Sequence, residues 1–128
     1  MVGYVSLDAS RSWILYWVTH SLVLLGVDFS ARYDQIIGEI SVIPSFNSFN
    51  KISIDTIAKF QNIGGGFGGG PGQISHGAPI FACVLTLLSI GTPRAYELID
   101  RPKLYQFILS MKQPNGGFSI QADGYLSL

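Results

Sequence analysis

Apolar residues in this sequence recur at helical spacing, most clearly in ASRSWILYWVTHSLVLLG, residues 9–26. Asp8 or Ser10 is predicted to cap this helix, and Gly26 is predicted to end it. One face carries Trp13, Trp17, His20 and Leu24, and the opposite side carries Ile14, Leu15, Val18, Leu22 and Leu25. A helix that is apolar nearly all round is expected to be buried on more than one face.

The same spacing predicts five further helices, at residues 30–41, 53–61, 76–91, 93–99 and 100–113. Proline in the first turn and glycine after the end are typical helix boundaries, as Pro79 and Gly91 illustrate. Asp100 is a predicted cap, and the helix after it should turn Leu104, Phe107, Ile108 and Met111 inward. No run alternates as a strand would, so the sequence predicts an all-α protein.

Residues 42–53, VIPSFNSFNKIS, interrupt this pattern. Pro44 and the paired serine and asparagine residues predict a loop here. The following helix would then begin near Ser53 or Asp55.

Two glycine-rich corners form an internal repeat. FQNIGGGF and MKQPNGGF each follow an amphipathic helix, and their phenylalanines, Phe67 and Phe118, are 51 positions apart. Such a period is typical of stacked helical units. Residues 64–69 formally match a dinucleotide-binding pattern, but a helix precedes them and Pro71 follows, whereas that pattern needs a strand before and a helix after. A flexible linker would lack Phe67. The sequence therefore favours a rigid corner anchored by a buried phenylalanine.

Composition narrows the possible functions. The chain is 48% hydrophobic and 12% charged, with a net charge of zero. Its Lys and Arg residues do not cluster, so the sequence offers no basic surface for a nucleic acid. The apolar run at 13–26 is shorter than the roughly 20 residues of a membrane span. We expect a single domain over residues 1–128, located in the cytoplasm. Cys83 is the single cysteine and is predicted to be a buried apolar residue.

The order of the motifs resembles the β subunits of protein farnesyltransferase. LDASRSW, YW, GGFGGGPGQ, HGAP, SIGT and KQPNGGF follow one another as they do in that family, over about residues 6–124. The resemblance implies an α/α barrel of helical hairpins, of which this chain would hold the first few. It also implies transfer of a farnesyl group from farnesyl diphosphate to the cysteine of a C-terminal CaaX motif. A zinc ion and a partner α subunit would be required.

Carried over by this resemblance, five residues would line the pocket for the CaaX peptide: Ser10, Trp13, Trp17, His76 and Ala78. Large flat indoles suit an aliphatic or methionine side chain. Without the resemblance, Trp13 and Trp17 would be interpreted as ordinary core residues, and His76 as a capping or turn residue.

The chain also departs from the family pattern. Residues 42–53 are expected to be an inserted surface loop, and the zinc ligands and diphosphate-binding residues of the family have no counterpart here. We therefore expect an early part of a β subunit that is inactive alone. The alternatives are a non-catalytic helical-repeat binding module and an unfolded truncation product.

Overall fold

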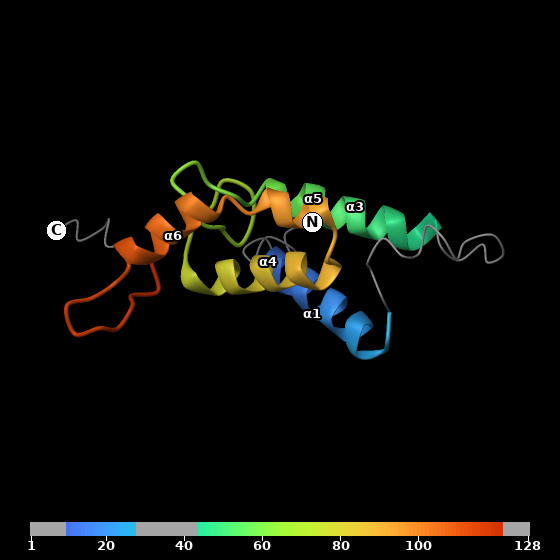
Figure 1. Ribbon diagram of the computed structural model, residues 1–128, viewed down its shortest axis with the longest axis horizontal. Coiled ribbons are helices and arrows are strands. Elements are labelled where there is room, and N and C mark those ends of the chain that lie inside the picture. Colours follow the sequence, from blue (N-terminus) through green and yellow to red (C-terminus); the bar gives the residue numbers. More distant parts are fainter. Residues whose placement is uncertain (1–9, 28–43, 122–128) are drawn as a thin grey trace, which may run out of the picture.

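A computed structural model describes residues 10–27 and 44–121 (Figure 1). Its helices are α1 (Arg11–Leu24), α3 (Pro44–Ala58), α4 (Gly77–Ile90), α5 (Pro93–Leu98) and α6 (Arg101–Ser110). Within these ranges the only extended pairing is two isolated bridges, so the all-α prediction is confirmed. The helix predicted at 30–41 lies outside the described residues. None of the described helices is long and apolar enough to cross a membrane.

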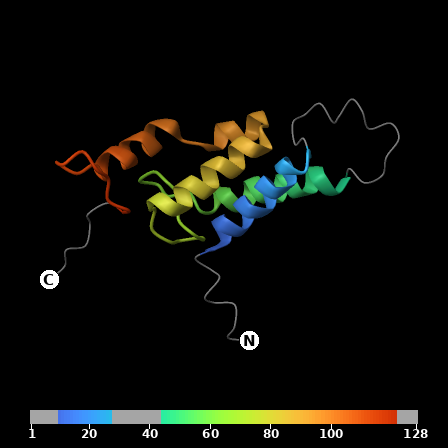
Figure 2. The ribbon, with the colours of Figure 1, turned by 90° about the horizontal axis from the view of Figure 1, so that it is seen from below.

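The helices form two layers (Figure 1). α1 and α4 lie side by side in one layer and run in the same direction, as Figure 2 also shows. α3 and α5 form the other layer, which α6 continues. The core lies between the layers and consists of buried side chains from both: Ile54, Ile57, Phe60, Phe67, Ile80, Cys83, Leu87, Ile90, Ala95 and Met111.

Most helix ends follow the predicted chemistry. Gly26 and Gly91 have φ angles of 82° and 69°, left-handed conformations that glycine adopts without a steric penalty. The Asp100 carboxylate accepts a hydrogen bond of 3.1 Å from the backbone N–H of Lys103, as a helix cap should. Ser10 occupies the cap position of α1, but its side chain makes no capping hydrogen bond.

The cap at Asp100 gives a pH-dependent prediction. The N–H of Lys103 holds the pKa of this carboxyl below its ordinary 3.8. A lowered pKa means that its stabilising effect is complete above pH 3.8 and is lost as the pH falls through the folded-state value. Acid unfolding followed by circular dichroism should show this contribution in the native chain. Asp100→Asn keeps the capping hydrogen bond but has no carboxyl group to titrate, so the acid-dependent loss of stability from this cap should be absent in the variant. An acid-unfolding profile identical to that of the native chain would exclude Asp100 as a titrating cap.

The prediction of a loop at 42–53 is wrong for the described part, because α3 already begins at Pro44. Proline is tolerated in a first helical turn, where its missing N–H has no partner to lose. The buried face of α3 comprises Asn50, Ser53, Ile54 and Ile57, which have helical spacing. Two of these four residues are polar, which concealed the helix from a hydrophobic pattern. That this stretch is an insertion stays a prediction.

The expectation that α1 is buried on several faces is also wrong. Only Ser12 and Thr19 of this helix are buried, and its main packing partner is α4. The other side of α1 is open to solvent, with Trp17 58% exposed and Leu24 75% exposed.

The predicted repeat of the glycine corners is confirmed in the backbone. Antiparallel bridges join Gln61 to Phe67 and Lys112 to Phe118, so the corners match at the same 51-residue offset. Two backbone hydrogen bonds of the first corner recur in the second at this offset. The bond from Asn62 N–H to Gly66 O corresponds to the bond from Gln113 N–H to Gly117 O. The bond from Gly68 N–H to Phe60 O corresponds to the bond from Ser119 N–H to Met111 O.

Candidate functional site

An aromatic cluster joins the first half of α1 to α4. The ring of Trp13 lies 6.0 Å from that of Phe81 on α4 and 5.9 Å from that of Trp17. Tyr16 packs edge-on against Phe81 at 5.6 Å and stacks on His20 at 5.3 Å. These five residues, which we call the aromatic patch, lie on the side of α1 and α4 that is partly open to solvent, with Trp17 58% and Phe81 50% exposed.

The predicted residues Trp13 and Trp17 therefore lie together, and three members of the patch, Tyr16, His20 and Phe81, were not among the predicted site residues. Spacing had placed His20 on the same helix face as the tryptophans. Tyr16 follows Trp13 by three positions, so helical spacing alone could have placed it beside Trp13. Phe81 is brought to the patch only by the packing of α4 on α1, which no local pattern reveals.

Ser10, His76 and Ala78 lie at helix starts near the glycine tract. Ser10 precedes α1, and the N–H of Ser12 donates to the Gly69 carbonyl at 3.4 Å. His76 precedes α4, and its N–H donates to the Phe67 carbonyl, also at 3.4 Å. The first turns of α1 and α4 therefore both contact the glycine tract, and the aromatic patch lies about one turn further along these helices. Within the part of the chain that the structure describes, no ring contact or hydrogen bond joins these three residues to the two indoles.

His76 has a polar atom that the fold leaves unused. Its Nδ1 is buried and has no hydrogen-bond partner among the described residues, although part of the ring reaches solvent. Burial lowers the pKa of this imidazole, which favours the neutral form. His76 occupies the cap position of α4, but its side chain does not cap the helix.

The glycine tract is a rigid corner, as predicted. Asn62 Nδ2 donates to the Gln73 carbonyl and to Ser75 Oγ, both at 2.8 Å, and Ser75 Oγ donates to the Gly65 carbonyl at 2.8 Å. Phe67 is fully buried at its centre. These hydrogen bonds tie the two ends of the tract together.

No group of three His, Cys, Asp or Glu side chains that could hold a metal is found in the ranges 10–27 and 44–121. The described residues therefore do not fit the zinc site that the family resemblance implies. Cys83 cannot serve as a thiolate ligand in its present environment, because burial raises the pKa of its thiol to about 12.

Cys83 should be unreactive in the folded protein. Raising the thiol pKa from 9.0 to about 12 lowers the thiolate fraction near neutral pH about a thousandfold. Labelling with a thiol reagent at pH 7.5 should be slow in buffer and fast in denaturant. Equal rates in the two conditions would show that the α4 core is not formed.

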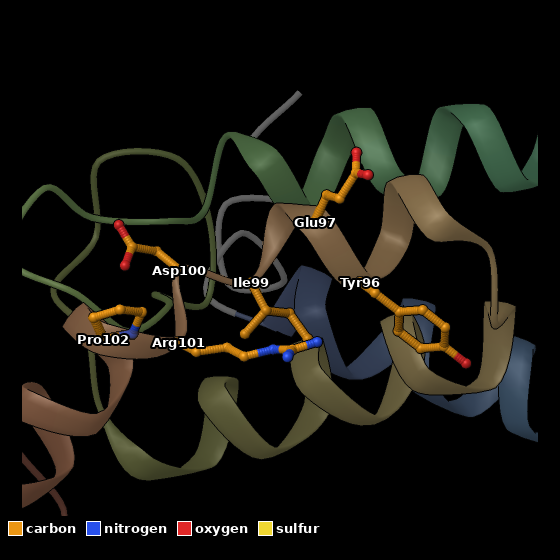
Figure 3. A pocket seen from close by; sticks show the side chains of 6 residues that line it. All are labelled: Tyr96, Glu97, Ile99, Asp100, Arg101 and Pro102. Atoms are coloured by element: carbon orange, nitrogen blue, oxygen red, sulfur yellow. The ribbon is translucent and has the colours of Figure 1, made fainter.

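A shallow hollow lies at the junction of α5 and α6 (Figure 3). It contains none of the predicted site residues, and Asp100 within it already caps α6. Its lining residues are Tyr96, Glu97, Ile99, Asp100, Arg101 and Pro102. We therefore place the candidate site at the aromatic patch.

Comparison with known proteins agrees with the fold and with the motifs. Residues 2–126 match the model of the prenyltransferase alpha-alpha toroid domain. The protein farnesyltransferase subunit beta of Pisum sativum is 34% identical over 118 residues, which are 92% of this chain and 24% of that protein. The Saccharomyces cerevisiae subunit beta is 37% identical over 114 residues, covering 88% and 23%.

The chain thus spans about a quarter of the length of these relatives. The resemblance to farnesyltransferase β subunits, inferred from the motifs, is confirmed by these matches. The chain belongs to the prenyltransferase alpha-alpha toroid family.

Proposed function

We propose that this chain is part of a protein farnesyltransferase β subunit and supplies one wall of the binding site for the CaaX peptide. The aromatic patch is the observation that carries the proposal. It gathers both tryptophans of the chain with Phe81 on one accessible side of α1 and α4. The relatives' name supports this function over a non-catalytic helical-repeat module.

The chemistry of the patch suits the end of such a peptide. Flat aromatic rings offer large apolar contact areas with few rotatable bonds, so they hold aliphatic or methionine side chains at a low entropic cost. The patch has no carboxylate that would repel a peptide's terminal carboxyl group. Ser10, His76 and Ala78 would border it at the helix starts, with His76 Nδ1 as a hydrogen-bonding group for the peptide.

Transfer of the farnesyl group would need further components. In the proposed function these are an α subunit, farnesyl diphosphate and a zinc ion held by other residues, in the cytoplasm. Because the described residues lack a metal-binding group, we expect the 128-residue chain to bind peptide without transferring a farnesyl group.

Photo-crosslinking tests this proposal. A CaaX peptide with benzophenone on its last aliphatic residue should label α1 or α4, and Trp17→Ala should reduce labelling severalfold because it removes an indole that is 58% exposed. Val18→Ala is the matched control, since Val18 is 43% exposed on the same helix but on the side opposite the tryptophans. Equal loss in both variants, or labelling of α6 instead, would contradict the proposed site.

A further inference from the structure

The second glycine corner carries an asparagine followed by two glycines, Asn115-Gly116-Gly117. Asparagine is chemically labile, and most so before glycine, because no Cβ then hinders the approach of the next backbone nitrogen to the side-chain amide. Two hydrogen bonds close the corner around this sequence. The N–H of Gly116 donates to the Gln113 carbonyl at 2.9 Å, and the N–H of Gln113 donates to the Gly117 carbonyl at 2.7 Å.

The two groups that would react lie at an open tip. Asn115 and Gly116 are both exposed, and no atom of the described residues lies within 4 Å of a Cβ added at Gly116. In Figure 1 this corner projects from the end of α6, away from the other helices. Breaking the hydrogen bond to Gln113 therefore frees the Gly116 nitrogen, and no packed side chain opposes the rotation that brings it to the Asn115 side chain.

The side-chain amide of Asn115 is polarised by the corner itself. Its Oδ1 accepts a hydrogen bond of 3.0 Å from the N–H of Gly117. Attack on Cγ places negative charge on Oδ1, and a backbone N–H in this position stabilises that charge, as it does in an oxyanion hole. The nitrogen that would leave, Nδ2, has no hydrogen-bond acceptor in the part of the chain that the structure describes.

The other three asparagines of the chain lack these features. Asn47 and Asn50 lie within α3, whose helical backbone holds the next nitrogen away from the side chain. Asn62, in the first corner, is followed by Ile63, whose branched side chain shields the backbone nitrogen. The Nδ2 of Asn62 also makes two hydrogen bonds of 2.8 Å across the glycine tract, which hold the side chain in place. Asn62 is therefore an internal control for Asn115.

We propose that Asn115 is a site of spontaneous covalent modification, at which the second corner is converted to aspartate and isoaspartate. The Gly116 nitrogen gives its proton to solvent and forms a bond to Asn115 Cγ. The bond from Cγ to Nδ2 breaks, and this nitrogen takes up a proton and leaves as ammonia, so that a five-membered succinimide remains.

Water then opens the succinimide ring in one of two directions. Addition at Cγ breaks the new bond to the Gly116 nitrogen and gives aspartate. Addition at the main-chain carbonyl carbon breaks the original peptide bond and gives isoaspartate, whose main chain runs through Cγ. The net reaction is hydrolysis of the side-chain amide to a carboxylate and ammonia, and it needs no oxidant, reductant or enzyme.

Both products change the corner. Each replaces a neutral amide with a carboxylate, so the formal net charge of the chain falls by one unit from zero. Aspartate keeps an acceptor oxygen for the N–H of Gly117. Isoaspartate adds a methylene group to the main chain inside the turn, so we expect it to break the hydrogen bond between Gln113 and Gly117 that closes the turn. This inference rests on the chemistry of the corner and is independent of the proposed peptide site.

Peptide mapping by mass spectrometry, after incubation of the chain at neutral pH and physiological temperature, tests the proposal. We expect Asn115 to gain the mass change of deamidation at least about tenfold faster than Asn62, because only the second corner opens locally without disturbing packed side chains. The rate should approach that of an isolated peptide of residues 110–121. Asn115→Gln should abolish the signal at this position, because glutamine would have to form a larger, less favourable ring.

Isoaspartate is measured separately, by transfer of a labelled methyl group from S-adenosylmethionine with an isoaspartyl methyltransferase as the probe. Asp123-Gly124 can also form isoaspartate, but without a change in mass, and the labelling that remains in Asn115→Gln measures this contribution. The proposal is overturned if Asn115 stays unmodified in a chain that is helical by circular dichroism while the isolated peptide deamidates. Equal rates at Asn62 and Asn115 in the folded chain would also overturn it.

Discussion

Phe67→Ala is expected to destabilise the chain by about 3–5 kcal/mol, the usual cost of removing a fully buried phenylalanine. Phe67 is 0% exposed and lies where α3, α4 and α6 meet the glycine corner. Its removal would leave a cavity that the corner cannot fill, because hydrogen bonds from Asn62 and Ser75 hold the tract rigid. Urea unfolding followed by circular dichroism measures the change.

The chain contains its own control for this substitution. Phe118 occupies the equivalent corner position with the same bridge geometry, but it is 55% exposed. Phe118→Ala should therefore change the free energy of unfolding by less than about 0.5 kcal/mol, as most surface substitutions do. Similar costs at the two positions would show that the first corner is not the buried member of the pair.

Gly65→Ala is expected to cost more than about 2 kcal/mol, for two independent reasons. Its φ angle of 97° lies where residues with a side chain are strained. The new methyl group would also approach the backbone carbonyl of Lys103 at 2.4 Å, so the first turn of α6 would have to move. The midpoint of urea unfolding should fall accordingly.

Gly64→Ala is the matched control, because a Cβ at Gly64 meets no atom of the described residues within 4 Å. It should leave stability unchanged within about 0.5 kcal/mol. If both alanine variants unfold at the same urea concentration as the parent chain, α6 does not pack on the corner.

Local chemistry predicted much of this fold. Glycines at 26 and 91 and the cap at Asp100 set helix ends through conformational and hydrogen-bonding preferences that act within a few residues. The inward residues of α6 were also correctly predicted: Met111 is buried, and Leu104, Phe107 and Ile108 pack against the core.

The errors arose where tertiary contacts override local pattern. The sequence predicts a loop for residues 44–53 of α3, because the buried face of this helix includes the polar residues Asn50 and Ser53. The sequence also predicts too much burial for α1. Its apolar residues show how much of the helix surface could be buried, but not which other elements pack against that surface. For the candidate site, spacing placed the tryptophans on one face, but Phe81 joins them only through helix packing.

Fluorescence titration with a CaaX peptide tests the central claim most directly, because Trp13 and Trp17 are the two tryptophans of the chain and both lie in the aromatic patch. We expect a saturable change in tryptophan emission that Phe81→Ala weakens severalfold. A peptide with aspartate in place of its last aliphatic residue should give no change. No emission change with the CaaX peptide, from a chain that is helical by circular dichroism, would contradict the assignment of this patch to peptide binding.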